Sequence, residues 1–322
     1  MGGINILLGV LGLVILLEFI MGVVTFWMLC VPVRKEGTPK TPEHVERAKL
    51  RKLNAERFMA LNPEDVHIQS ADGLTLRAWY LPADKETRRF VIPCHGHHAN
   101  GLSEFAHITP FYHDTLGYNI LLPDHRGHGR SEGKWIGFAA LDWPNVLLWV
   151  DWLVARYGED IEVILHGISM GAATVLLANE HNPPPQVKLI IEDCGFSCEK
   201  RELRDAGRFL FGDFEPLFLP AYPIAHLLQQ LFAGFSWHQS DPLGGMANAQ
   251  CPVLFIHGED DRYVPTRFAY ELYEACPTPK RLFIVPGAIH AFSYYVDPAG
   301  YNKAVTEFIE EHLDARIPAV SR

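Results

Sequence analysis

The chain begins with a long and almost unbroken run of apolar residues. Between residues 4 and 31 the polar side chains are Asn5, Glu18 and Thr25. About 20 apolar residues in a helix are enough to cross the hydrocarbon layer of a membrane. The run has neither the basic start nor the small-residue cleavage site that is typical of a signal peptide. We therefore expect residues 1–31 to form an uncleaved transmembrane anchor.

Glu18 interrupts this run near its middle, where a charged carboxylate is unfavourable. It could mark a contact between helices or carry a proton. A tolerated polar residue in an otherwise very apolar helix is the simpler interpretation.

The segment that follows is basic: Lys and Arg outnumber Asp and Glu between residues 34 and 57. Residues 32–62 are expected to form a linker, within which 43–60 have the pattern of an amphipathic helix. Such a helix could lie on anionic lipid headgroups or be solvated. Because basic flanks tend to stay in the cytoplasm, we expect a single-pass membrane protein whose remaining chain is cytoplasmic.

From residue 63 onward, short apolar runs alternate with helix-length stretches. The runs 66–68 and 74–81 flank Ala71-Asp72-Gly73 and predict a β-hairpin. The other predicted strands are Phe90–Cys94, Asn119–Pro123, Ile161–His166, Leu189–Asp193, Val253–His257 and Arg281–Val285. The predicted helices are Leu102–Thr115, Asp142–Tyr157, Met170–His181, Arg267–Ala275 and Ala299–Asp314. This alternation predicts an α/β domain over residues 63–318, with a mostly parallel central sheet and helices on both faces.

One stretch departs from the alternation. Residues 197–250 separate two predicted strands by far more than a usual connection and are rich in Phe and Leu. We expect them to form a small helical cap. A site beneath it would lie beyond the carboxyl ends of the strands, where sites form in parallel sheets.

Composition narrows the class of protein. Apolar residues make up 48% of the 322 residues and charged residues 20%, which is ordinary for a globular protein and excludes long disorder. A formal net charge of −10 argues against a nucleic-acid partner. The six scattered cysteines form neither a disulfide scaffold nor a zinc-type pair.

The sequence Gly167-Ile168-Ser169-Met170-Gly171 joins a predicted strand to a predicted helix. A G-x-S-x-G motif in this context is typical of a nucleophile elbow, in which the serine hydroxyl is exposed on a sharp turn. Gly167 and Gly171 permit the turn. We therefore expect Ser169 to be a catalytic nucleophile.

A serine hydroxyl needs a base, and the base needs an orienting acid. His290 follows the last predicted strand, and Asp261 follows the strand Val253–His257. We expect these two residues to be that base and that acid, with Asp260 as the neighbouring candidate for the acid.

The negative charge that develops on the substrate oxygen needs hydrogen-bond donors. The backbone N–H of Met170, next to the nucleophile, is one candidate. The second is expected in the loop His95-Gly96-His97, where Gly96 allows a close backbone approach and the N–H of His97 donates.

These motifs together resemble the α/β-hydrolase superfamily over roughly residues 64–315. The chain is most similar to bacterial membrane-anchored hydrolases related to monoacylglycerol lipases and prolyl-aminopeptidase-like enzymes. The residues that carry the resemblance are His95-Gly96, Asp124 to Ser131, the elbow, His257-Gly258-x-x-Asp261-x-x-Val264-Pro265 and His290. The resemblance implies an α/β-hydrolase fold, a structural role for Arg126 and Ser131, and ester cleavage through an acyl-enzyme without a metal or cofactor.

The substrate stays open at this point. An apolar cap near a membrane favours a small-molecule ester with an apolar acyl chain, such as a monoacylglycerol or a lysophospholipid. A serine aminopeptidase is the alternative, and it would need a cap carboxylate to hold the substrate ammonium group. The candidates are Glu199, Glu202, Asp205, Asp213, Glu215 and Asp241.

Three further interpretations concern other residues or another class of protein. The chain could be a catalytically silent binding protein on a hydrolase fold. The cluster of His95, His97, His98, Asp124 and His125 could bind zinc, although its spacing is not that of a metallo-hydrolase. Cys194 and Cys198 could form a redox pair, and two semi-buried thiols are the simpler interpretation.

Overall fold

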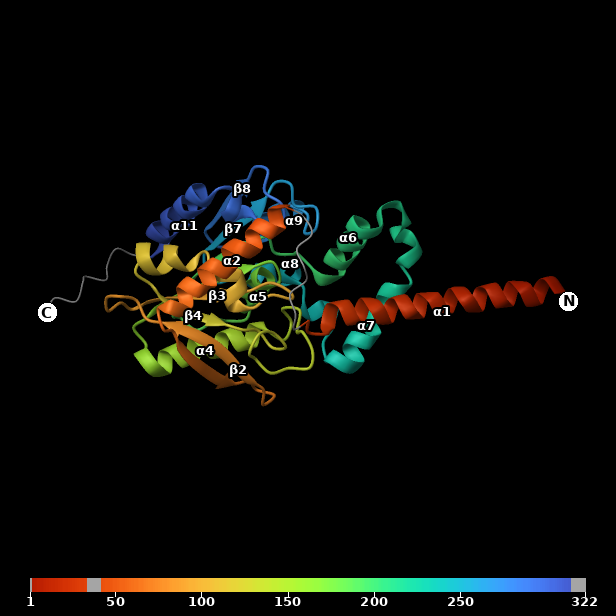
Figure 1. Ribbon diagram of the computed structural model, residues 1–322, viewed down its shortest axis with the longest axis horizontal. Coiled ribbons are helices and arrows are strands. Elements are labelled where there is room, and N and C mark those ends of the chain that lie inside the picture. The colour runs from red at the N-terminus through yellow and green to blue at the C-terminus, as the bar shows by residue number, and fades with distance from the viewer. Residues whose placement is uncertain (1, 34–41, 314–322) are drawn as a thin grey trace.

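The structure of the chain is a computed structural model that describes residues 2–33 and 42–313. An eight-stranded sheet forms its centre, with the strand order β1-β2-β4-β3-β5-β6-β7-β8 (Figure 1). The strands are β1 (Glu64–Gln69), β2 (Thr75–Leu81), β3 (Arg89–Cys94), β4 (Asn119–Pro123), β5 (Glu162–Ile168), β6 (Val187–Asp193), β7 (Val253–Gly258) and β8 (Lys280–Val285). All predicted strands are present.

The sheet is parallel except at one edge. β1 and β2 form the predicted hairpin, and β2 pairs with β4 antiparallel, whereas β4, β3, β5, β6, β7 and β8 are mutually parallel. Gly73 has a φ of +83° in the hairpin turn, a conformation that costs glycine little. The prediction of a mostly parallel α/β sheet is confirmed.

Helices cover the sheet and follow most strands. The main helices are α1 (Gly2–Cys30), α2 (Pro42–Ala60), α3 (Gly101–Phe105), α4 (Trp143–Tyr157), α5 (Met170–Glu180), α6 (Glu199–Phe211), α7 (Ala221–Leu228), α8 (Pro242–Gly245), α9 (Arg267–Ala275), α10 (Ser293–Val296) and α11 (Pro298–His312). The short 3-10 and π segments are η1 (Phe111–Thr115), η2 (Gly212–Phe218), η3 (Gln229–Ala233), η4 (Trp237–Gln239) and η5 (Met246–Asn248). Between β6 and β7 the chain is helical, which confirms the predicted cap.

The prediction of one continuous helix over residues 102–115 is wrong. The structure has the short helix α3 and, after a turn at residues 106–108, a second segment that includes η1. Pro110 lacks the N–H that an uninterrupted helix would use, and its ring would clash with the carbonyl of Ala106. Proline is tolerated at the start of a helix, and Pro110 lies directly before η1.

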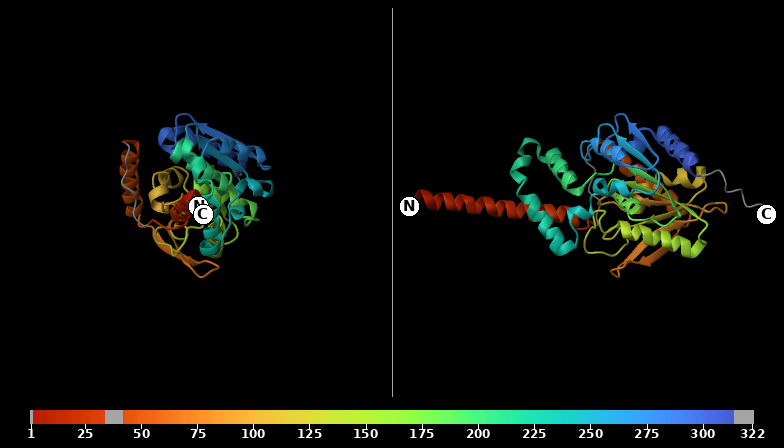
Figure 2. Two further views of the ribbon diagram at one scale, coloured as in Figure 1. Left: turned by 90° about the vertical axis from the view of Figure 1, so that its right-hand side faces the viewer. Right: turned by 180° about the vertical axis from the view of Figure 1, so that it is seen from behind.

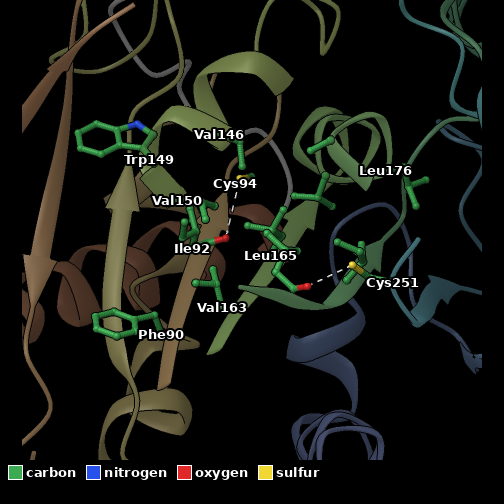
Figure 3. Packing of buried hydrophobic residues seen from close by; sticks show 14 of the residues in the cluster. Phe90, Ile92, Cys94, Val146, Trp149, Val150, Val163, Leu165, Leu176 and Cys251 are labelled. Carbon is green, nitrogen blue, oxygen red and sulfur yellow. Dashed lines mark hydrogen bonds between the residues drawn. The ribbon is translucent and has the colours of Figure 1, made fainter. Parts of the chain in front are cut away.

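Alternate side chains of the central strands pack into two separate hydrophobic cores, one on each face of the sheet. On β3, Phe90, Ile92 and Cys94 point to the face covered by α4 and α5, and Figure 3 shows their packing against Trp149 and Val163. Their neighbours on the same strands, such as Val91 and Ile164, belong to a second core on the opposite face. The period of two explains why these strands are apolar throughout: both faces are buried.

Helix α1 projects from the body as a long rod, with the cap elements α6 and α7 beside its inner part (Figures 1 and 2). Residues 3–30 form a helix that is long and apolar enough to cross a membrane. The last turns of α1 belong to the body, because Phe26 and Cys30 are buried in a cluster with Ile136 and Phe235. The N–H of Ile136 also donates to the carbonyl of Cys30 at 2.8 Å.

Helix α2 packs on the body. Arg47 and Arg51 both donate to the carboxylate of Glu104 on α3, and Phe58 is buried against the sheet. The amphipathic pattern of residues 43–60 is explained by this packing: Phe58 belongs to the core, while Lys49 and Lys52 remain exposed.

Burial shifts the ionisation of several groups in the body. Burial, reinforced by the negative charge of Asp241, raises the pKa of Glu180 to about 9. Burial also raises the pKa of Glu192 to about 7, in spite of the attraction of His257. In the opposite direction, burial lowers the pKa of both His95 and His125 to about 4. The folded state therefore keeps Glu180 and both histidines uncharged at neutral pH.

These shifts predict that the protein loses stability as the pH rises from about 7.5 to about 9. An unfolded glutamate releases its proton near a pH of about 4.3, whereas Glu180 and Glu192 release theirs only as the pH passes their raised values. The folded state then holds more protons than the unfolded state, so its stability falls with rising pH. The buried histidines act in the opposite direction near pH 6.5, where an unfolded histidine is half protonated, but above about pH 7.5 they are neutral in both states and contribute little.

Thermal unfolding between pH 7.5 and pH 9 measures this effect. The Tm of the wild type should decline over the range, and Glu180→Gln should make the decline shallower at its alkaline end. A Tm that rises toward pH 9, or an identical slope in the variant, would contradict the assignment of Glu180 as a buried neutral acid.

Candidate active site

Ser169 lies in the turn between β5 and α5, as the motif predicts. Its backbone has φ 56° and ψ −118°, which is a strained conformation for a residue with a side chain. The turn brings α5 so close to β3 that a Cβ on Gly171 would lie 1.9 Å from the carbonyl oxygen of Cys94. A Cβ on Gly167 would lie 2.1 Å from the carbonyl oxygen of Gly171. The two glycines of the motif are therefore required by close backbone contacts.

The structure brings Ser169, His290 and Asp261 into one hydrogen-bonded chain. The hydroxyl of Ser169 lies 2.9 Å from Nε2 of His290, and Nδ1 of His290 lies 2.7 Å from Oδ2 of Asp261. In the tautomer that satisfies both bonds, Nδ1–H donates to the carboxylate and Nε2 accepts from the hydroxyl. This arrangement lets the imidazole remove the serine proton.

Asp261 is buried and held in place from its other side. Its Oδ1 accepts from the backbone N–H groups of Tyr263 and Val264, at 3.0 and 2.9 Å. Burial alone would raise the pKa of Asp261, but attraction to His290 and hydrogen bonds from His257 and His290 outweigh it and lower the pKa to about 2. The carboxyl group is therefore ionised at neutral pH. Its neighbour Asp260 is exposed to solvent.

The loop after β3 lies against Ser169. A Cβ on Gly96 would lie 3.3 Å from Cβ of Ser169. Among the described residues, the backbone N–H groups of His97 and Met170 make no hydrogen bond to another protein group. Both amides are thus free to donate to a substrate oxygen beside the serine.

His95 braces this loop against the next one. Its Nδ1–H donates to the carbonyl of Gly96 at 2.8 Å, and its Nε2 accepts from the backbone N–H of His125 at 3.0 Å. The second bond requires a neutral imidazole, which agrees with the lowered pKa of this buried histidine. His95 therefore links the loops that follow β3 and β4.

The loop after β4 is fixed by charged and polar side chains. Arg126 forms a two-pronged ion pair with Asp72 in the β1–β2 turn, at 2.9 and 3.1 Å. Ser131 donates to the carbonyl of Asp124 at 2.6 Å, and it accepts from the backbone N–H of Arg77. These contacts support the structural role that the resemblance implies for Arg126 and Ser131.

The histidine cluster that suggests zinc does not converge on a single point. Nε2 of His97 bonds to the carbonyl of Leu29 at 2.9 Å, while both ring nitrogens of His95 have the backbone partners given above. Within the described residues, the set with the spacing of metal ligands is Cys194, Asp261 and His290, whose ligand atoms lie within 4.8 Å of one another. Two of its members already bond to each other.

Tyr263 is a neighbour of the triad that sequence reasoning missed, whereas Cys194 was considered as half of a redox pair. Both cysteines of that pair are free thiols, and burial raises the pKa of Cys194 well above its usual range. The ring of Tyr263 lies 5.2 Å from that of His290. The position of Tyr263 in the loop after β7 is a signal that could have identified it, because sites form beyond these strand ends.

Comparisons with known proteins find similarity to hydrolase families. A family model described as serine aminopeptidase, S33, matches residues 85–211, and one described as serine hydrolase (FSH1) matches residues 164–291. The chain is 31% identical over 260 residues to the protein YqkD of Bacillus subtilis, which covers 81% of this chain and 83% of YqkD.

Two further proteins are more distant. The chain is 27% identical over 224 residues to the lysophosphatidylserine lipase ABHD12 of Mus musculus, which covers 64% of this chain and 49% of that lipase. The solved structure of the esterase Pf2001 from Pyrococcus furiosus superposes with a TM-score of 0.65 at 21% identity, over 89% of this chain and 99% of the esterase. The similarity to the esterase shows the fold alone. With this sheet and with a relative so similar across most of its length, the chain belongs to the α/β-hydrolase superfamily.

Proposed function

We propose that this hydrolase cleaves carboxylic esters through a Ser-His-Asp triad and an acyl-enzyme. The hydrogen-bonded chain from Ser169 through His290 to Asp261 is the observation that carries the proposal. A positioned imidazole converts a poor nucleophile into a reactive one, and an ionised carboxylate stabilises the imidazolium that results.

The reaction takes place in two halves. Ser169 attacks the acyl carbonyl carbon while His290 takes the hydroxyl proton, and the backbone N–H groups of His97 and Met170 donate to the developing oxyanion. His290 then returns the proton to the leaving alcohol. Water then attacks the acyl-enzyme while the same imidazole takes its proton, and His290 returns that proton to the Ser169 oxygen as the carboxylic acid leaves.

We propose a membrane lipid ester, with one apolar acyl chain and a polar headgroup, as the substrate. Helix α1 would anchor the protein in the membrane that holds such lipids. Beside His290 lies a hollow of about 560 Å³ whose lining includes the charged side chains of Arg47, Asp260 and Arg262, which could bind a polar headgroup. The relative ABHD12 is described as a lysophosphatidylserine lipase, which is the same chemical class.

The aminopeptidase alternative keeps the support of one family model. An ammonium-binding carboxylate in the cap should be ionised and free of strong partners. Asp205 pairs with Arg267, Glu215 lies within 3.8 Å of both Arg204 and Arg208, and Asp241 caps α8. Burial raises the pKa of Glu199 to about 8 and that of Glu202 well above its usual range. For these five of the six candidates the contacts and burial favour the esterase over the peptidase, whereas the sixth, Asp213, is exposed to solvent.

The side of the membrane on which the hydrolase domain lies is also a proposal. We propose a single-pass protein with residues 1–31 as the anchor, residues 32–62 as the linker and residues 63–318 as the hydrolase domain in the cytoplasm. Of the basic residues between 34 and 57 on which the orientation rests, Arg34, Lys35 and Lys40 lie outside the described residues, as does the end of the domain beyond Leu313.

A panel of p-nitrophenyl esters from two to sixteen carbons tests the reaction and its substrate class. We expect hydrolysis by the full chain in detergent micelles, with kcat/KM higher for decanoyl or longer esters than for acetyl esters, because each buried methylene adds about 0.8 kcal/mol of binding. Labelling of the wild type with a fluorophosphonate should accompany it.

Other outcomes identify the alternatives. Release of p-nitroaniline from amino-acyl anilides without ester hydrolysis would favour the aminopeptidase. A chain that neither hydrolyses a substrate nor takes the fluorophosphonate label would favour a binding protein. A preference of 100-fold or more for acetyl or butyryl esters would exclude the lipid substrate and keep the esterase.

A further inference from the structure

We propose that the acyl chain of the lipid lies in a cavity between α1 and α6, so that the membrane helix forms one wall of the substrate site. This inference rests on the proposed ester hydrolysis and assigns a place to one half of the substrate. The cavity measures about 340 Å³, within the range of roughly 300–1,000 Å³ that is typical of small-molecule sites.

The two long walls of the cavity are apolar. Met21, Val24 and Met28 line it from α1, and Leu203, Ala206 and Leu210 line it from α6. The remaining lining residues carry no charge at neutral pH, because burial lowers the pKa of His97 to about 3 and keeps that imidazole neutral. A cavity of this kind suits a hydrocarbon chain and rejects a charged headgroup.

One end of the cavity lies near the triad. His97 lines the cavity, and so does Tyr263, whose ring lies 5.2 Å from that of His290. Tyr263 also lines the hollow that includes Arg262 and His290. Tyr263 therefore borders both spaces, and we assign the acyl chain of the ester to the cavity and its headgroup to the hollow.

The wall formed by α1 is firmly fixed. Nε2–H of His97 donates to the carbonyl of Leu29 in the last turn of α1, at 2.9 Å. Farther out, a Cβ on Gly22 would lie 2.5 Å from the side chain of Ile224 of α7, so the backbone of α1 packs directly on the cap. This packing holds α1 at a constant position relative to the catalytic loop.

The outer surface around the cavity is suited to contact with lipid. On α1, Trp27 is 60% exposed and Met28 is 56% exposed, close to where the helix joins the body. The cap presents a similar surface, with its exposed apolar residues Phe209, Leu210, Phe211, Phe214, Leu217, Leu227, Leu231 and Phe232. Because exposed apolar patches of this extent mark contact with a membrane or a partner, and α1 lies among them, we infer that the cap is immersed beside α1 and that lipid enters from the bilayer.

Matched tryptophan substitutions test the cavity in the full chain. Val24→Trp on α1 and Ala206→Trp on α6 would each fill it from one wall. Val10→Trp, on the lipid-exposed part of α1, and Ala247→Trp, on the exposed surface of η5, make the same changes outside it. The readout is the ratio of kcat/KM for p-nitrophenyl palmitate to kcat/KM for p-nitrophenyl butyrate, measured in the same micelles.

We expect both cavity variants to lower this ratio by about tenfold or more, since a lost contact for one or two methylene groups already costs about that factor. The two control variants should keep the wild-type ratio. Leu203→Ala enlarges the cavity and should raise the preference for the longer chain, which keeps the test valid if the tryptophan variants fold poorly.

Two failures are distinguishable. If the wild type hydrolyses esters but the ratio is the same in the wild type, Val24→Trp, Ala206→Trp and Leu203→Ala, the acyl chain lies elsewhere and this inference is overturned. If the wild type hydrolyses neither ester, the proposed function itself fails.

Discussion

Ser169→Ala should lose ester hydrolysis by about 10⁵-fold or more in kcat, with the fold unchanged. The variant removes the only group of the triad that bonds to the substrate carbon. His290 then has no hydroxyl to deprotonate, so adding His290→Ala to Ser169→Ala should cost little more. Residues that act as a unit give such non-additive losses.

Steady-state hydrolysis of the preferred ester, together with fluorophosphonate labelling, measures this effect. Ser236→Ala is a suitable control, because Ser236 lies in the cap and its hydroxyl bonds within its own turn, to Gln239. It should keep activity within about twofold, as expected for a surface change away from the site. Equal activity of Ser169→Ala and the wild type would show that another residue is the nucleophile.

Asp261→Asn should lower kcat by about 10⁴-fold, through the tautomer of His290 rather than through a loss of packing. The backbone N–H groups of Tyr263 and Val264 require an acceptor, so they should hold the amide oxygen where Oδ1 lies now. The amide NH₂ would then face Nδ1 of His290. That nitrogen would accept, its proton would move to Nε2, and the imidazole could no longer take the proton of Ser169.

Asp260→Asn is the matched control, since it makes the same change one residue earlier on an exposed side chain. With a p-nitrophenyl ester, which has no lipid headgroup to meet Asp260 in the hollow beside His290, we expect its kcat to stay within about threefold of the wild-type value, in line with a surface substitution. The opposite ranking of the two variants would assign the acid to Asp260. A rate loss in Asp261→Asn that is accompanied by unfolding would leave the tautomer without support, and circular dichroism of both variants detects it.

The sequence predicts the central sheet and the arrangement of the triad well. The apolar strands are recognisable because both faces of the sheet are covered, and each candidate catalytic residue directly follows such a strand. Since the carboxyl ends of parallel strands meet at one edge, the chain positions of Ser169, Asp261 and His290 are enough to expect that they lie together.

Features that depend on packing between distant segments could not be predicted. Nothing in the pattern of residues 43–60 indicates that Arg47 and Arg51 share Glu104 as a partner. The same limit applies to the cavity, whose walls α1 and α6 are far apart in sequence, and to the packing of α1 on the cap, where Gly22 contacts Ile224 of α7. The break in the helix predicted over 102–115 is a different error, because Pro110 is visible in the sequence and argues for it.

The bonds that join α1 to the body determine how this enzyme would meet its substrate. The carbonyls of Leu29 and Cys30 accept from His97 and from the N–H of Ile136, so the body cannot rotate freely about the anchor. Once α1 is inserted, the mouth of the site stays at one depth and faces one leaflet. The search for substrate then takes place in two dimensions. The concentration that matters is the mole fraction of the ester in that leaflet rather than its amount per volume of solution.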